Sequence, residues 1–123
     1  MEQIQHSTIT TNGIINMHIA SIGTGPPVLL LHGFPELWFS WHHQLLSLSS
    51  LGYRAIAPAS CTAPYIVGAL VSLLDHLDID QVFLVGQDWG AVIAWYFSLF
   101  RPDRVKAVIN SGIAYFFFFL GEY

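Results

Sequence analysis

Charged side chains are scarce in this sequence. Asp, Glu, Lys and Arg make up only 10% of its 123 residues, whereas soluble domains average about 25%. Hydrophobic residues account for 54% of the chain. A folded form of this chain has too little charge to cover its whole surface. The composition therefore indicates either a membrane protein or a part of a larger fold whose apolar faces are covered by other segments.

Long apolar runs are also missing. A membrane-spanning helix needs about 18 or more consecutive apolar residues, and the longest obvious run here is Ala91–Phe100. Residues 1–6 contain neither a cationic start nor an apolar segment, so we expect no secretory signal. These two absences favour the partial fold over the membrane protein, and they predict a cytoplasmic location.

Cysteines and cations are few as well. The single cysteine, Cys61, cannot form an internal disulfide, which fits a reducing compartment. Four Lys and Arg residues and a net charge of −4 provide no basic patch, so we expect no nucleic-acid partner.

The six histidines show no repeated ligand spacing, and a zinc site needs three or four convergent ligands. We expect no metal and no cofactor.

Short apolar runs alternate with amphipathic segments, and Pro and Gly residues separate them. The runs predict strands at 14–22, 27–31, 53–57, 82–85 and 105–109, the first of them paired antiparallel with 8–10. The amphipathic segments predict helices at 36–51, 66–77 and 89–100. This alternation is typical of one α/β domain over residues 1–123, with a mostly parallel sheet, helices on both faces and an N-terminal antiparallel hairpin. Ligands of such sheets bind at the carboxyl ends of the strands.

One motif stands at such a carboxyl end. Gly86-Gln87-Asp88-Trp89-Gly90 follows the predicted strand 82–85 and opens the helix 89–100. This is the G-x-nucleophile-x-G pattern, in which glycines at positions 86 and 90 permit a sharp turn that lifts the central side chain above the sheet. Alone it is also compatible with an ordinary glycine turn. The strand before it and the helix after it favour the sharp turn that presents a nucleophile, which is called a nucleophile elbow.

The central residue of this motif, Asp88, is an acid rather than a serine. A carboxylate is already ionised at neutral pH and needs no base to become a nucleophile, and a helix N-terminus favours the charged form. Carboxylates attack saturated carbon, such as an epoxide or alkyl-halide carbon. The product is an enzyme ester that water must later cleave, and only this second step needs a histidine.

A second motif, His32-Gly33-Phe34-Pro35, follows the buried strand 27–31 at the same edge of the predicted sheet. In this architecture one oxyanion-hole N–H comes from the residue after the nucleophile, and the other comes from the loop after the earlier strand. Those donors are predicted to be the backbone amides of Trp89 and Phe34. Trp38 lies just beyond this loop and is equally compatible with lining a pocket and with packing a helix.

At these motifs the chain resembles the plant-type soluble epoxide hydrolases, a family with the α/β-hydrolase fold. The resemblance extends over most of residues 1–112 and is carried by Thr11–Ile14, His32–Trp41, Leu51–Pro58, Val82–Gly86, Asp88–Ala91 and Arg101–Val105. It implies that Asp88 is the covalent nucleophile, that a small hydrophobic epoxide is the substrate, and that the substrate lies against His32, Pro35 and Trp38.

The resemblance is partial, and the chain corresponds to the N-terminal part of the family pattern. The family continues through a helical cap with two tyrosines and returns with an acid and a water-activating histidine, none of which has a match here. Residues 59–63 replace an expected acid and Arg-Gly-rich loop, and Gln87 stands where a histidine is common. The tail at Phe116–Phe119 matches nothing in the family. We therefore expect an inactive or single-turnover epoxide hydrolase.

Three alternatives remain open. Haloalkane dehalogenases share an Asp elbow followed by Trp. A non-catalytic binding or dimerising fragment is the second, because missing strands would leave an apolar sheet edge that favours a homo-oligomer. The third is a shortened product without a selected role.

Overall fold

The structure is a computed structural model that describes residues 4–11, 15–32, 41–58 and 66–111. Its centre is a six-stranded sheet with the order β1-β2-β4-β3-β5-β6. The elements are β1 (Gln5–Thr11), β2 (Ile15–Ile22), β3 (Pro27–Leu31), α1 (His42–Ser50), β4 (Arg54–Pro58), α2 (Ile66–His76), β5 (Val82–Gln87), α3 (Trp89–Phe100), the short 3₁₀ helix η2 (Pro102–Arg104) and β6 (Val105–Ser111).

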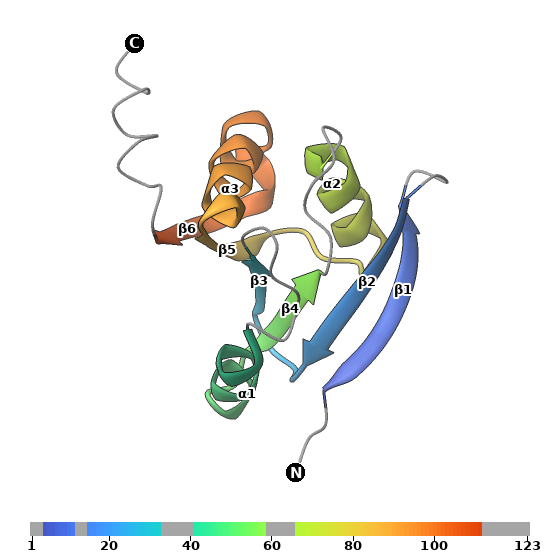
Figure 1. Cartoon of the computed structure of the whole chain (residues 1–123), viewed down its shortest axis with the longest axis vertical. Helices are drawn as coiled ribbons and strands as arrows, with labels where there is room; N and C mark the ends of the chain where they lie inside the picture. Colours follow the sequence, from blue (N-terminus) through green and yellow to red (C-terminus); the bar gives the residue numbers. More distant parts are fainter. Residues whose placement is uncertain (1–3, 12–14, 33–40, 59–65, 112–123) are drawn as a thin grey trace.

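The sheet has two parts. β1, β2 and β4 pair antiparallel in that order, whereas β4, β3, β5 and β6 are parallel to one another. Figure 1 shows α1 on one face of the sheet and α2 and α3 on the other. The predicted α/β architecture, with its N-terminal antiparallel hairpin and helices on both faces, is confirmed.

Two apolar clusters pack on the two faces of the sheet. Alternate residues of β3 divide between them, because successive side chains of a strand point to opposite faces. Leu29 and Leu31 join the cluster under α2 and α3, and Leu30 joins the cluster under α1 with Trp41 and Leu45. The unbroken apolar sequence of β3 is thus explained by burial on both sides.

The element boundaries agree with the sequence patterns at β3 and α3 and differ elsewhere. β5 and β6 each run two residues beyond the predicted strands, because Gly86 pairs with Asn110 and Gln87 with Ser111. The helix predicted at 36–51 is observed from His42 to Ser50, and its predicted residues 36–40 lie outside the described ranges. Within those ranges, no helix is long and apolar enough to cross a membrane.

One region of the α1 face is uncovered by the described helices. α1 packs mainly against β4 and β2. The register places Val85 of β5 beside Ile109 of β6 on that face, and Ile109 is 64% exposed. Next to them the Lys106 Nζ lies 5.7 Å from the centre of the Phe83 ring. β6 is the last strand of the sheet, so its outer edge is unpaired among the described strands.

Candidate active site

Asp88 joins β5 to α3 in a backbone conformation that is rare for a side-chain-bearing residue. Its φ is 57° and its ψ is −124°. Among the described residues other than glycine, only Asp78 and Asp88 have a positive φ. Such conformations cost about 1–3 kcal/mol and persist only where the surrounding structure enforces them. The turn leaves the Asp88 side chain exposed at the carboxyl end of the parallel strands.

The two glycines of the motif are required by close packing. A Cβ at Gly86 would lie 2.7 Å from both the Asn110 Oδ1 and the Gly90 carbonyl oxygen. A Cβ at Gly90 would collide with the Leu31 carbonyl and lie 2.9 Å from the carbonyl oxygen of His32. Real Cβ atoms essentially never approach other atoms so closely. A side chain at either position would therefore push α3 away from the strands that support it.

These contacts bring the two predicted motifs together. Leu31, the last residue of β3, is in register with Gly86 of β5. The first turn of α3 packs directly on the end of β3, because Gly90 has no side chain to keep the two apart. Asp88 and the start of the loop that follows β3 thus share one edge of the sheet, as the sequence predicts.

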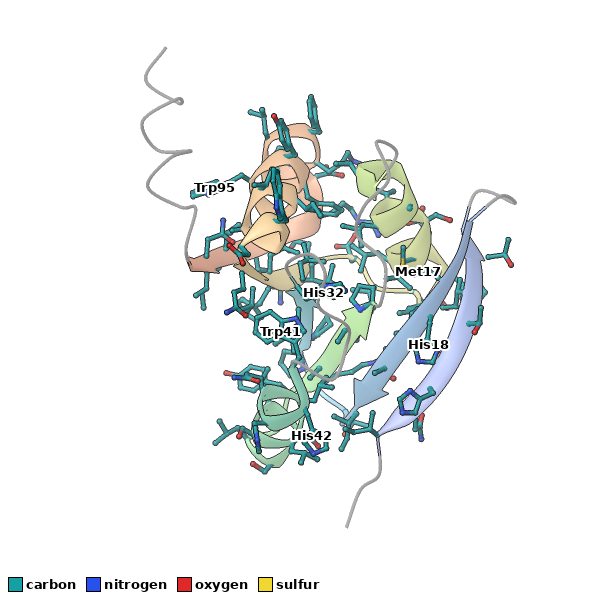
Figure 2. All side chains as sticks on the ribbon, in the orientation of Figure 1. Met17, His18, His32, Trp41, His42 and Trp95 are labelled. Carbon is teal, nitrogen blue, oxygen red and sulfur yellow. The ribbon has the colours of Figure 1, made fainter. Side chains whose placement is uncertain are left out.

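The structure places some of the other predicted site residues. His32 is buried at the end of β3, with 5% of its surface exposed, and Figure 2 shows it near the centre of the molecule. Trp89 is the first residue of α3 and is 58% exposed. Its backbone N–H is among the first of α3, which have no acceptor within the helix. Phe34, Pro35 and Trp38 lie outside the described residues.

Asn110 is a neighbour of the elbow that the sequence reasoning missed. Its Nδ2 donates a hydrogen bond of 3.3 Å to the Ala91 carbonyl oxygen in the first turn of α3. Its buried Oδ1 has no hydrogen-bond partner within the described ranges. The Asn110 side chain therefore links β6 to the first turn of α3. The signal in the sequence that could have identified Asn110 is its place as a polar residue directly after the apolar predicted strand 105–109.

Two hollows that described residues line lie at the opposite end of the parallel strands from Asp88. One is lined by residues that include Gly25, Pro27, Arg54 and Lys106, and another lies between Asp75 and Arg104. These residues stand at the amino ends of the parallel strands, away from Asp88. No group of three potential metal ligands occurs within the described part of the chain.

Comparison with known proteins agrees with this geometry. Residues 61–120 match a family model described as alpha/beta hydrolase fold. The chain is 65% identical over 127 residues to Epoxide hydrolase 2 of Siraitia grosvenorii, an alignment that covers 92% of this chain and 40% of that protein. It is 41% identical to an Epoxide hydrolase of Caballeronia sordidicola, covering 91% of this chain and 38% of that protein.

Solved structures give the same result. A mutant of an epoxide hydrolase from Vigna radiata superposes with a TM-score of 0.81 at 52% identity, covering 88% of this chain and 38% of that one. Potato (Solanum tuberosum) epoxide hydrolase I superposes with a TM-score of 0.80 at 44% identity, covering 88% and 39%. The chain therefore spans about 40% of the length of these four relatives.

Proposed function

Because the chain has the α/β-hydrolase fold and is a relative of the plant epoxide hydrolases, we propose that Asp88 opens the ring of a small hydrophobic epoxide. A carboxylate oxygen of Asp88 attacks one ring carbon, and the bond between that carbon and the ring oxygen breaks. The ring oxygen keeps the electron pair and takes a proton from water. The product is an ester between Asp88 and a hydroxyalkyl group.

The main support for this proposal is the conformation of Asp88. The residue accepts an unfavourable φ of 57° at the junction of β5 and α3, and its carboxylate is exposed there rather than buried. Strained backbone that the surrounding packing enforces is typical of functional positions. The close approach of Gly90 to Leu31 fixes this turn relative to the end of β3.

The second half of the reaction is proposed to be slow or absent. Release of the product requires water to attack the Asp88 carbonyl carbon, and the oxyanion formed there would accept hydrogen bonds from the amides of Trp89 and Phe34. That water also needs a base. The acid and histidine that the family resemblance expects for this step have no counterpart in the 123 residues. We therefore propose one alkylation of Asp88 rather than repeated turnover.

Incubation of the chain with a reactive aryl epoxide tests this function. We expect one covalent adduct per chain in the intact mass, with no sustained diol formation. Asp88→Asn removes the nucleophile and should abolish the adduct. Asp78→Asn is a matched control, because Asp78 is also exposed and has the same φ of 57°. Asp78 lies before β5, at the amino ends of the parallel strands and away from Asp88. Continuous diol release would overturn the single-turnover proposal.

A second candidate is a dehalogenase-like reaction on alkyl halides. It is favoured by the exposed Trp89 directly after Asp88, since an indole N–H can donate a hydrogen bond to a leaving halide. A halide-release assay with an alkyl bromide distinguishes the two. Halide release that exceeds epoxide alkylation, and that is lost in Asp88→Asn, would favour the dehalogenase.

We also propose that the chain self-associates through β6. This strand is the last of the sheet and presents Ile109 at 64% exposure, whereas the opposite edge strand, β1, exposes mostly polar side chains. Apolar edge strands favour pairing with another chain. Sedimentation should detect a dimer that Ile109→Lys dissociates and that Thr8→Lys on β1 leaves intact. A monomer at all concentrations would contradict the proposal.

A cytosolic location is part of the same proposal. Its support is the single cysteine, Cys61, which fits a reducing compartment. Cell fractionation of the tagged chain tests it.

A further inference from the structure

The carboxamide of Asn110 touches the chain on both sides of Asp88. Gly86 of β5 and Asn110 of β6 are in register, and α3 packs on both of these strands (Figure 1). A Cβ at Gly86 would lie 2.7 Å from the Asn110 Oδ1, so this oxygen lies against the Gly86 backbone. The Asn110 Nδ2 donates its hydrogen bond of 3.3 Å to the Ala91 carbonyl oxygen. One side chain therefore contacts a residue shortly before Asp88 and another shortly after it.

Ala91 carries this contact to the backbone of Asp88. The Ala91 N–H donates a hydrogen bond of 3.0 Å to the Asp88 carbonyl oxygen. The ψ of Asp88 sets the direction of that carbonyl, and it is −124° beside a φ of 57°. Because Ala91 is bonded to Asn110 at its carbonyl and to Asp88 at its N–H, a displacement of the Asn110 side chain is transmitted through one residue to Asp88.

The stability of the fold does not by itself explain an asparagine at position 110. Its Oδ1 is buried, and no donor reaches this oxygen within the part of the chain that the structure describes. Burial of a polar atom without a partner destabilises the folded state. An apolar side chain of the same shape would avoid this cost. The Ala91 carbonyl lies inside a helix and would keep its bond to the N–H four residues later.

We propose that Asn110 is a positioning residue for the Asp88 nucleophile. Its carboxamide holds the first turn of α3 against the ends of β5 and β6. This contact keeps the backbone of Asp88 in the strained conformation that exposes the carboxylate. The inference rests on the proposed function, because the step that Asn110 assists is the alkylation of Asp88. Asn110 acts through Ala91, and no bond to the epoxide is assigned to it.

Asn110→Leu tests this role, because leucine has nearly the shape of asparagine but no hydrogen-bonding side-chain atom. We expect the maximal rate of Asp88 alkylation by a reactive aryl epoxide to fall about tenfold, while the epoxide concentration that gives half of this rate stays unchanged. The midpoint of urea denaturation should not fall, since the variant buries no unpaired oxygen. Asn110→Ala removes the same bond without adding apolar bulk, and it gives the same test if circular dichroism shows that the leucine variant is unfolded.

Gln81→Met is the matched control. The Gln81 Nε2 also donates a hydrogen bond to a backbone carbonyl oxygen, that of Asp103, at 3.0 Å. This bond joins the segments that precede β5 and β6, at the ends of the two strands that lie away from Asp88. The control should therefore form the Asp88 adduct at the parent rate.

Hydrogen exchange separates this inference from the proposed function, because it needs no reaction. The bond from the Ala91 N–H to Asp88 should open more often in Asn110→Leu, so the Ala91 amide should exchange about tenfold faster. Gln81→Met should leave this exchange unchanged. If the parent chain forms no adduct, the proposed function fails and the exchange of Ala91 still decides the role of Asn110. Parent-like exchange in Asn110→Leu, an unchanged alkylation rate, or an equal loss in Gln81→Met would overturn the proposal.

Discussion

The buried guanidinium of Arg104 holds together the segments that precede β5 and β6. Its side chain is 10% exposed and donates hydrogen bonds of 2.6 Å to the carbonyl oxygens of Asp80 and Ile79. It also forms an ion pair of 2.9 Å with Asp75. These bonds tie the short helix η2 to the turn that precedes β5. The guanidinium provides several donors in one plane, which a lysine cannot reproduce.

Removal of this side chain should be costly. Arg104→Ala leaves two carbonyl groups without their donor, and we expect a loss of about 2–4 kcal/mol in the free energy of unfolding. Arg101→Ala is the control, because its ion pair with Asp103 is exposed and should contribute little to stability. Urea denaturation measures both, and equal losses from the two variants would contradict this account.

The Asp103 carboxylate should make stability depend on pH. The side-chain hydrogen bond from Arg101 lowers the pKa of Asp103 below its ordinary value of 3.8, with the charge of Arg101 acting in the same direction. A carboxylate with a lowered pKa stabilises the folded state above its unfolded pKa, and this contribution is lost as the pH falls through the lowered value. The pair is exposed, so the effect is small.

An NMR titration of the Asp103 carboxyl carbon measures this directly. We expect a midpoint below 3.8 in the parent chain and a shift upward in Arg101→Gln. Asp103→Asn should also flatten the decline in stability between neutral and acidic pH. An unchanged midpoint in Arg101→Gln would show that the hydrogen bond is not the cause.

At the scale of elements, α3 can pack against the end of β3 only because position 90 has no side chain. Gly90→Ala should destabilise the chain by about 1–3 kcal/mol, because its Cβ meets the Leu31 carbonyl group. It should also lower the rate of Asp88 alkylation, since the elbow must shift. Gly52→Ala provides the comparison: its φ is +93°, but no atom lies within 4 Å of its Cβ.

The Gly52 variant should therefore lose stability through backbone strain alone and keep the alkylation rate. Chemical denaturation and the rate of adduct formation separate the two effects. If Gly52→Ala slows alkylation as much as Gly90→Ala, the packing explanation of the elbow is wrong.

The sequence predicted those elements whose boundaries are set locally. Pro27 and His32-Gly33 bound β3. Arg101-Pro102 ends α3, because proline cannot continue a helix. The extension of β5 and β6 could not be predicted from local patterns, since it depends on pairing between Gly86 and Asn110. The contact between His6 of β1 and His18 of β2 was missed for the same reason: it follows from the register of two strands, not from spacing along the chain.

The candidate site was predicted in part. Glycine spacing located Asp88 and its turn, because only a small set of backbone conformations fits a strand followed at once by a helix. The role of Gly90 in seating α3 on Leu31, and the support from Asn110, required the three-dimensional contact between separate strands. The roles of Phe34, Pro35 and Trp38 stay predictions, since they lie outside the described residues.

At the scale of the whole molecule, the apolar composition and the architecture agree. α2 and α3 cover one face of the sheet, whereas α1 packs mainly against β4 and β2 and leaves Ile109 exposed. The chain also spans about 40% of the length of its relatives. An apolar face that the described helices leave open accounts for a sequence with 10% charged residues, and it is the reason to expect association through β6.

The most direct test of the account is to locate the alkylated residue by peptide mapping after exposure to a reactive aryl epoxide. The exposed carboxylates of Asp75, Asp78, Asp80 and Asp103 are internal controls on the same chain. We predict an adduct on Asp88 that exceeds any adduct on these four at least tenfold. Equal modification of the five carboxylates, or an unmodified Asp88, would contradict the claim that the turn between β5 and α3 makes this carboxylate a nucleophile.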